Sequence, residues 1–282
     1  MPEIIEAEIT RQKLAPALKG RRILKFSTDW PRGFVSEERN FRSVTRSFAN
    51  SKITGMSRMG KVVVVNMAGK RVLAIHQRMS GHVALSDLPT EGLARAGDAT
   101  TGKHSHFVFE LDNRRSFALV DPRKFGVVWY GSKKWFQQQP YIKKLGPDAL
   151  KIEKEDFAGI FKNSPRSSVK SLLLKQDRIA GLGNIACDEI LWHSRIHPTR
   201  KASALGAGEA EKIYTSMRVI LTDVLKYGGT SMSDWLHPDG AKGTYQDNFK
   251  VYKQNRCKRC SSAILRIKVA GRGTHICSQC QK

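Results

Sequence analysis

Four of the five cysteines stand near the C-terminus in two pairs whose spacing is typical of metal ligands. Cys257 and Cys260 form one C-x2-C pair, Cys277 and Cys280 form a second, and residues 261–276 separate them. Each pair points two thiolates at one ion, and two such pairs complete a closed tetrahedral shell. The spacing therefore predicts one structural Zn²⁺, with no position left for a reacting water. The chemistry must lie elsewhere in the chain.

The alternatives to a zinc site fit the sequence less well. Two disulfides would leave Cys187 unpaired, and the first residues lack the pattern of a secretory signal. A redox C-x-x-C motif would need a surrounding βαβ unit, which the sequence does not suggest. Residues 263–276 are rich in β-branched residues around a central AGRG, which predicts a hairpin and hence a zinc ribbon. We expect Cys187 to be a small buried residue rather than a nucleophile.

The charge of the chain points to a polyanionic partner. Lys and Arg number 49 against 25 Asp and Glu, a formal net charge of +24. Nucleic acid is the leading candidate, since neither a long apolar run nor a lipidation motif suggests a membrane partner. We expect a monomer in the cytoplasm, associated with the nucleoid. Charge alone leaves a non-enzymatic nucleic-acid-binding protein open.

Hydrophobic patterning predicts an α+β multidomain chain. A helix is expected over 3–18, followed by short β-branched and aromatic runs that predict a β-sandwich or flattened barrel. A helical domain and the ribbon follow, which gives domains at 1–135, 136–248 and 249–282. We expect strands at 61–67, 71–76, 106–111, 116–120 and 125–130, and helices at 153–163, 167–177, 185–195 and 206–227. Loops are expected at 89–104 (mobile) and 228–248 (glycine-rich), and a linker at 131–150.

A glycine-rich turn precedes the helix expected at 185–195. Gly181 and Gly183 allow a tight turn, and Asn184 is a favourable N-cap for that helix. Backbone N–H groups at such a helix start bind phosphate, and the Asn184 amide could donate a further hydrogen bond. An ordinary corner between two helices is the alternative, because a single G-x-G is a weak signal.

Several motifs together resemble one family along the whole chain and in the same order. They are MPEIIEAEIT at the N-terminus, MGKVVVV (59–65), RMSG (78–81), DPRKFG (121–126), LGPDAL (145–150), GLGNIACDEILWHSRIHP (181–198) and GRGTHICSQC (271–280). The chain resembles the formamidopyrimidine-DNA glycosylase (Fpg) and endonuclease VIII family. The resemblance implies a bifunctional glycosylase and AP lyase of base excision repair that acts on damaged double-stranded DNA. It also implies that 181–198 forms a helix–two-turn–helix motif.

The resemblance assigns the chemistry to the first residues of the chain. It implies that Pro2, once the initiator methionine is removed, attacks the damaged nucleotide as a secondary amine and forms an imine. Glu3 is the implied proton shuttle, Glu6 supports it, and Lys61 contacts the flanking phosphate and the damaged base. Taken alone, Pro2 and Glu3 would also suit an ordinary helix start, and Lys61 an exposed turn.

Other matched residues are implied to bind the duplex. Met79, Arg123 and Phe125 would fill the space left by an extruded base, although Met79 and Phe125 would equally suit strand ends in a core. His104 is implied to contact DNA, or alternatively is a solvated residue at a strand start. Asn184 and Arg272 are implied to hold phosphates, Arg272 from the ribbon hairpin. The chain departs from the family at Gln77 and Arg78, where relatives usually carry an apolar residue and glycine.

The glycine-rich segment at 228–248 bears on the substrate. It begins with GGTS, continues with DWLHPDGAKG and leads to NFKVYKQ, all similar to the Fpg branch, in which a loop closes over a flipped purine. The resemblance therefore favours oxidised purines, namely 8-oxoguanine and formamidopyrimidines, with removal followed by β,δ-elimination. An endonuclease VIII-like enzyme for oxidised pyrimidines is the alternative, and a disordered connector is the alternative for the segment itself.

Overall fold

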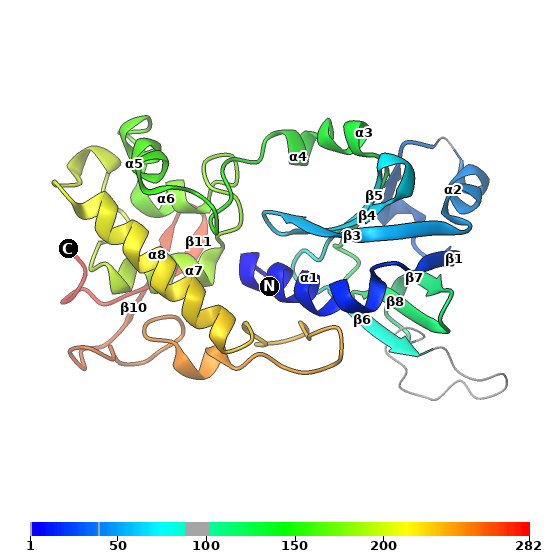
Figure 1. Ribbon diagram of the computed structural model, residues 1–282. Coiled ribbons are helices and arrows are strands. Elements are labelled where there is room, and N and C mark those ends of the chain that lie inside the picture. The colour runs from blue at the N-terminus through cyan, green and yellow to red at the C-terminus, as the bar shows by residue number, and fades with distance from the viewer. Residues whose placement is uncertain (1, 39, 88–101) are drawn as a thin grey trace. The chain divides into compact units, whose positions relative to one another are not determined.

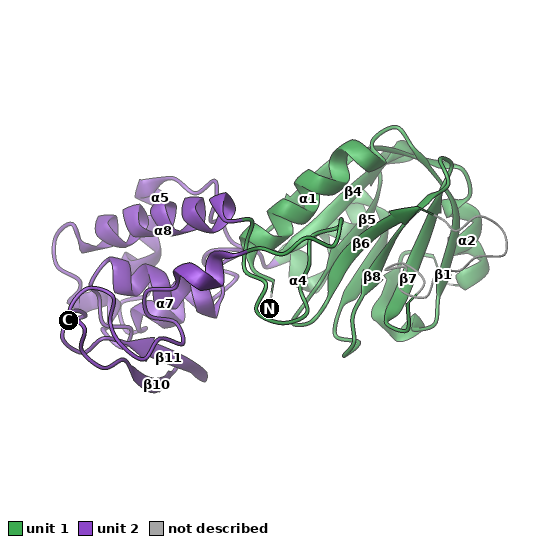
Figure 2. Cartoon of the chain, turned by 90° about the horizontal axis from the view of Figure 1, so that it is seen from below, with its two compact units in different colours: residues 1–143, 228–243 green, residues 144–227, 244–282 purple. Residues whose placement is uncertain are grey.

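The computed structural model describes residues 2–38, 40–87 and 102–282. The chain forms two compact units, one of residues 1–143 with 228–243 and the other of residues 144–227 with 244–282 (Figure 2). The first boundary falls inside the predicted linker 131–150, which forms two short helices, α3 (Lys133–Gln137) and α4 (Pro140–Lys143). The glycine-rich segment 228–243 belongs to the first unit. Most of the loop expected at 89–104 lies outside the described residues.

The first unit is built on a sheet in the order β2-β9-β5-β4-β3-β1-β7-β8-β6 (Figure 1). Its neighbours are antiparallel except for β2 and β9. β1 and β3 pair only at Arg22–Lys52 and Ile23–Ser51, so the sheet divides there into two halves. The strands are β1 (Arg22–Thr28), β2 (Phe34–Ser36), β3 (Ser51–Met59), β4 (Val62–Met67), β5 (Arg71–His76), β6 (His82–Asp87), β7 (Ser105–Leu111), β8 (Arg115–Val120) and β9 (Val127–Ser132).

Residues of both halves share one hydrophobic core, as the predicted sandwich requires. Phe109 of β7 stacks on Phe26 and Phe117 with ring centroids 4.9 and 4.8 Å apart, and Tyr130 of β9 joins the same cluster. The five predicted strand runs correspond to β4, β5, β7, β8 and β9 and are confirmed within two residues. Short runs of β-branched and aromatic residues between turn residues explain this success, because such runs are visible in the sequence itself.

The predicted N-terminal helix is α1 (Ile4–Leu18), but it is more deeply buried than an amphipathic surface helix. Its first two turns bury Ile4, Ile5 and Ala7, and they also bury the polar residues Glu6 and Thr10. Polar groups inside a protein must find hydrogen-bond partners. A second helix of this unit, α2 (Phe41–Phe48), packs Val44 and Phe48 into the core.

The second unit contains four principal helices and the hairpin. The helices α5 (Lys154–Lys162), α6 (Val169–Leu174), α7 (Asn184–His193) and α8 (Glu209–Lys226) confirm the four predicted segments. Strands β10 (Leu265–Val269) and β11 (Arg272–Ile276) form the predicted antiparallel hairpin. Its turn places Ala270 and Gly271 at φ values of 50° and 72°, as tight two-residue hairpin turns require. In the described part of the chain, every helix is too short or too polar to cross a membrane.

Two consecutive buried carboxylates on α7 fasten the ribbon to the helical part of this unit. Asp188 Oδ1 contacts Lys170 Nζ at 2.5 Å, and Asp188 Oδ2 accepts the His275 N–H at 2.9 Å. Lys170 also donates to Thr274 Oγ1 at 2.6 Å, although its side chain is fully buried. Glu189 accepts backbone N–H groups of residues 250–252. Buried charges of this kind require both partners, so α7 and β11 hold a defined relative position.

Candidate active site and nucleic-acid interface

The start of α1 places the predicted nucleophile and both predicted carboxylates together. Pro2 is buried and immediately precedes the helix, and Glu3 and Glu6 are 6% and 3% exposed. Glu3 and Glu6 form a capping box, in which Glu6 Oε2 accepts the Glu3 backbone N–H at 2.8 Å. Burial, followed by the charge of Glu3, raises the pKa of Glu6 above its ordinary value. The start of α1 therefore holds two carboxyl groups that are almost excluded from solvent.

The glycine-rich segment 228–243 is fastened to this helix start. Glu6 Oε1 accepts the Thr230 N–H at 2.9 Å, so one carboxylate binds both the helix and the segment. The two ends of the segment meet closely, since a Cβ at Gly243 would lie 2.3 Å from the carbonyl oxygens of Gly228 and Gly229. Lys13 and Asp239 form an ion pair at 2.6 Å. The alternative of a disordered connector does not hold for these residues.

Lys61 occupies the predicted turn between β3 and β4, next to a buried histidine. Burial, then the charges of Arg78 and Lys61, lowers the pKa of His76 to about 3. Nδ1 of His76 faces the Arg78 backbone N–H at 3.0 Å, and Nε2 lies 3.2 Å from the Tyr141 hydroxyl. Because a backbone N–H only donates, Nδ1 must be the unprotonated acceptor. His76 is therefore a neutral support for the turn that leads to Met79.

The predicted void-filling residues lie on two loops that share one buried carboxylate. Met79 and Phe125 are 42% and 49% exposed, so the alternative of strand-end core residues is wrong for both. The Arg123 guanidinium lies 5.2 Å from the centre of the Phe125 ring. Fully buried Asp121 accepts the Ser80 hydroxyl at 2.5 Å and the N–H groups of Phe125 and residue 126 at 2.7 Å each.

Asp121 is a functional residue that the sequence reasoning missed. Its carboxylate holds both exposed apolar side chains at a fixed place, because Ser80 follows Met79 directly and the Phe125 N–H is itself a donor. The signal was present in the DPRKFG motif, since an aspartate at the start of a turn often accepts the backbone N–H groups that follow it. The backbone of His104 lies beside Asp121, because the His104 carbonyl oxygen accepts the Asp121 N–H at 2.9 Å.

At the start of α7 the structure corrects one expectation. Gly183, not Asn184, is the N-cap residue, and Asn184 is the first residue of the helix. The Asn184 amide instead donates to the carbonyl oxygen of Gly273 at 2.9 Å. Gly273 follows Arg272, so this bond joins the helix start to the hairpin beside the exposed Arg272. The physical reason is tertiary, because the packed hairpin offers the amide an acceptor that a helix terminus alone does not.

The four predicted metal ligands converge in the second unit. The Sγ atoms of Cys257, Cys260, Cys277 and Cys280 all lie within 4.8 Å of one another. Two of the separations are 3.9 Å (Cys257–Cys280) and 3.4 Å (Cys260–Cys277), whereas a tetrahedral zinc shell with bonds of ~2.3 Å would need about 3.8 Å. The donor set therefore fits one structural zinc ion. Cys187 is buried away from this set, as expected.

Two residues next to the thiols, Trp192 and Arg259, support the zinc site without binding the metal. The Trp192 indole N–H donates to Cys257 Sγ at 3.2 Å, which favours the thiolate form that binds metal. The Arg259 guanidinium stacks over the Trp192 ring at 4.1 Å. Because Trp192 belongs to α7, these contacts attach the ribbon to the same helix that carries Asn184.

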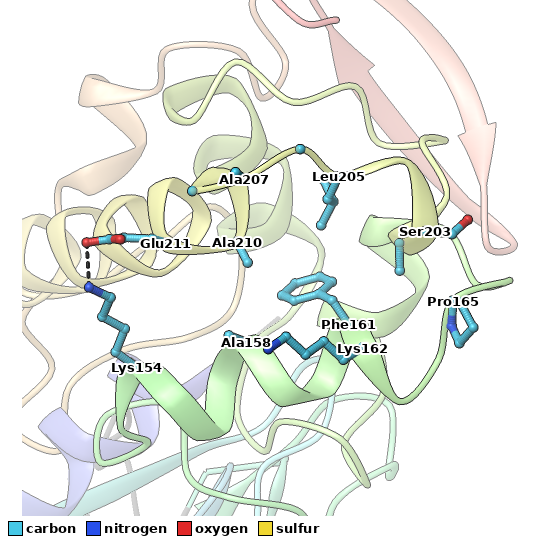
Figure 3. Close-up of a pocket in the computed structure, with 13 residues that line it drawn as sticks. Lys154, Ala158, Phe161, Lys162, Pro165, Ser203, Leu205, Ala207, Ala210 and Glu211 are labelled. Carbon is cyan, nitrogen blue, oxygen red and sulfur yellow. Dashed lines mark hydrogen bonds and ion pairs between the residues drawn. The ribbon is translucent and has the colours of Figure 1, made fainter.

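A separate hollow of about 600 Å³ lies on the second unit between α5, the 202–211 segment and α8 (Figure 3). Phe161 and Leu205 point into it, and the Lys154–Glu211 ion pair crosses its edge at 2.6 Å. None of the predicted catalytic, DNA-binding or metal residues lines it. The hollow is therefore separate from the residues predicted to carry the reaction.

Comparison with known protein families finds matches to three successive parts of the chain. Three family models match, in order, the formamidopyrimidine-DNA glycosylase N-terminal domain (residues 1–128), the formamidopyrimidine-DNA glycosylase H2TH domain (145–235) and the zinc finger found in FPG and IleRS (255–282). The fold and these matches define a DNA glycosylase with a helix–two-turn–helix motif and a zinc finger.

Full-length relatives place the chain more narrowly. Formamidopyrimidine-DNA glycosylases of Heliobacterium modesticaldum and Listeria monocytogenes are 34% and 32% identical, each alignment covering 100% of both chains. A Lactococcus lactis Fpg structure with DNA containing an abasic site is 31% identical with a TM-score of 0.85, covering 99% of both chains. The Thermus thermophilus Fpg structure is 31% identical with a TM-score of 0.84, covering 99% of this chain and 98% of that one. The chain belongs to the formamidopyrimidine-DNA glycosylase family.

The zinc site generates the first prediction. Cys257→Ser removes one ligand and should release zinc, and it should lower affinity for damaged DNA at least tenfold because the hairpin loses its rigid base. Arg272→Ala should retain zinc yet weaken binding by about tenfold, since one charge-assisted contact is lost. Zinc content and fluorescence-anisotropy titration measure both. Unchanged affinity of the zinc-free variant would exclude the ribbon from the DNA surface.

Asp121 generates the second. Asp121→Asn turns an NH₂ group toward backbone donors and should lower the free energy of unfolding by about 2–4 kcal/mol. The variant should also bind abasic-site DNA more weakly, because Met79 and Phe125 lose their common support. Asp29→Asn is the matched control, since the Asp29 side chain is 58% exposed and pairs with His106 and Lys124; it should cost less than ~1 kcal/mol. Similar losses in the two variants on urea unfolding would contradict the assignment.

The third prediction concerns pH. The folded-state pKa of His76 is lowered to about 3, so below pH ~6.5 the unfolded chain takes up a proton that the folded chain does not. Stability is therefore lost as the pH falls, by roughly 2 kcal/mol between pH 7 and pH 5 from this one group. His76→Gln should remove that part of the pH dependence of the unfolding free energy. Parallel pH profiles for the two proteins would show that His76 does not titrate in this way.

Proposed function

We propose that this protein excises oxidised purines from duplex DNA and then cleaves the strand through an imine on Pro2. Its family membership makes it a DNA glycosylase of base excision repair, and the reaction belongs to the start of α1. The observation that carries the proposal is the buried arrangement of Pro2, Glu3 and Glu6, with the segment 228–243 bonded to the Glu6 carboxylate. Solved relatives include Lactococcus lactis Fpg mutants bound to DNA that contains Fapy-dG.

In the first step the Pro2 nitrogen, freed by removal of the initiator methionine, attacks C1′ of the damaged nucleotide. A terminal α-amine titrates near pH ~7.7–8, so a useful fraction is unprotonated at neutral pH. As the N–C1′ bond forms, the bond from C1′ to the base breaks, and the base leaves with the proton that the Pro2 nitrogen gives up. Glu3 supplies a proton to the ring oxygen as the sugar opens to the iminium. Glu6 supports Glu3 through the capping box.

The second step breaks the strand. The iminium acidifies the C2′ proton, whose removal expels the 3′ phosphate, and loss of the C4′ proton then expels the 5′ phosphate. These β- and δ-eliminations need no redox partner, and hydrolysis returns the Pro2 amine. Lys61, on the turn beside His76, binds the phosphate flanking the lesion and contacts the damaged base.

The duplex is held and opened by residues of both units. Met79 and Phe125 enter the stack as apolar wedges, while Arg123 offers donors to the base left without its partner. Arg272, with its planar guanidinium, grips the backbone, and Asn184 and His104 contribute further phosphate contacts. The zinc ion in the ribbon holds the hairpin of Arg272 rigid and takes no part in the chemistry.

Two further points belong to the proposal. The substrate class is oxidised purine, 8-oxoguanine and formamidopyrimidines, because the 228–243 segment is an ordered part of the catalytic unit as a base-capping element requires. The protein acts as a monomer on damaged duplex DNA in the cytoplasm, at the nucleoid. The net charge of +24 favours that location by attraction to the phosphate backbone.

Borohydride trapping tests the proposal. Borohydride added during reaction with an 8-oxoguanine duplex or an abasic duplex should reduce the imine and leave a stable protein–DNA adduct. A variant with one glycine inserted before Pro2 is the matched control, because its Pro2 nitrogen remains in a peptide bond and cannot attack. If the processed protein forms no adduct with any oxidised base or with abasic DNA, the proposed imine mechanism is refuted. Salt-sensitive binding without cleavage would instead indicate a non-enzymatic DNA-binding protein.

A competition between two damaged duplexes distinguishes oxidised purines from oxidised pyrimidines as the preferred substrate. In competition, the duplex with 8-oxoguanine opposite cytosine should be consumed before the duplex with thymine glycol opposite adenine. Preference for thymine glycol would indicate an endonuclease VIII-like activity.

A further inference from the structure

Gln77 and Trp235 form a buried hydrogen bond between the end of β5 and the segment 228–243. The Trp235 indole N–H donates to Gln77 Oε1 at 3.1 Å across 158 residues of sequence. Gln77 is 1% exposed and Trp235 is 2% exposed. A buried amide without partners is costly, so each side chain depends on the other. Gln77 is also one of the two positions at which this chain departs from its family pattern.

The Gln77 amide extends this contact to α1. Its Nε2 donates to Thr10 Oγ1 at 3.3 Å, and the Thr10 hydroxyl donates to the carbonyl oxygen of Glu6 at 2.8 Å. The orientation of the amide is determined, because an indole N–H only donates and must face the amide oxygen. A continuous chain of hydrogen bonds thus runs from Trp235 through Gln77 and Thr10 to the residue that supports Glu3.

The two contacts fix both ends of an exposed stretch of the segment. Thr230 is bonded to Glu6 Oε1, and Trp235 is bonded to Gln77. Between them, residues 232–234 are exposed, and Met232 presents 36% of its surface. The other Glu6 oxygen accepts the Glu3 N–H, so a single carboxylate joins the beginning of this stretch to the start of α1.

We propose that Gln77 is a positioning residue for base recognition, which acts through Trp235 to set where residues 231–234 lie beside the helix start. The inference rests on the proposed function. Because a base on the sugar that reacts with Pro2 must lie near this helix start, the exposed stretch can contact it. An abasic nucleotide has no base to contact, so its cleavage should not depend on the stretch. Gln77 therefore affects excision and leaves the lyase step unchanged.

The experiment uses zinc-loaded, processed protein and compares four variants with the wild type. Gln77→Leu and Trp235→Phe each leave one buried polar group without its partner, and each should lower kcat/KM for 8-oxoguanine excision by about tenfold. The double variant Gln77→Leu/Trp235→Phe leaves neither group unpaired and should return to within about threefold of the wild type. Trp135→Phe, on α3 of the same unit, is the matched control and should leave kcat/KM unchanged. Cleavage of abasic DNA should change less than about twofold in all four.

Hydrogen exchange of residues 228–243 provides a readout besides activity. Faster exchange of this segment in each single variant, with protection restored in the double variant, would support the positioning role. Equal losses of excision and abasic cleavage would show a merely structural pair and overturn the proposal. A double variant as impaired as the worse single variant would overturn it as well. If the wild type itself forms no borohydride adduct, the proposed function fails, a result separate from any comparison between variants.

Discussion

The buried carboxylate of Glu6 is the contact on which the first unit depends. One oxygen accepts the N–H of Glu3 and the other accepts the N–H of Thr230, two residues that are far apart in the sequence. Burial raises the pKa of this group, while the two backbone donors oppose the rise. A charge at that position is tolerable only while both segments stay in place, so the helix start and the glycine-rich segment hold each other.

The same device recurs at two other places. Asp121 joins the loop of Met79 to the loop of Phe125, and Asp188 joins α7 to Lys170 and to the ribbon. Each carboxylate is fully buried and accepts donors from separate segments. Short acidic side chains suit this purpose, because two oxygens offer several acceptor positions on little conformational freedom.

Gln77 and Arg78 show how two adjacent polar residues at the end of β5 are accommodated. Gln77 finds its donor in Trp235 and its acceptor in Thr10, so the oxygen and the nitrogen of its amide each form a hydrogen bond. Arg78 adopts a φ of 55°, a conformation that favours glycine, and its guanidinium lies over the Tyr141 ring at 5.4 Å. The backbone strain is offset by contacts that glycine could not make. The two adjacent side chains thus lie in different directions, Gln77 toward the interior and Arg78 toward Tyr141 of α4.

The sequence by itself determined the features that depend on local order. The two C-x2-C pairs specify a zinc site because a tight turn brings such thiols together, and runs of β-branched and aromatic residues located β4, β5, β7, β8 and β9. Residue identities along the chain were also sufficient for the family resemblance. Tertiary structure alone decided that Asp121 joins the loops of Met79 and Phe125, that Asn184 binds Gly273 instead of capping α7, and that Gln77 meets Trp235. Such contacts leave no periodic trace in the sequence, because a polar side chain acquires its partner only when distant segments pack together and water is excluded.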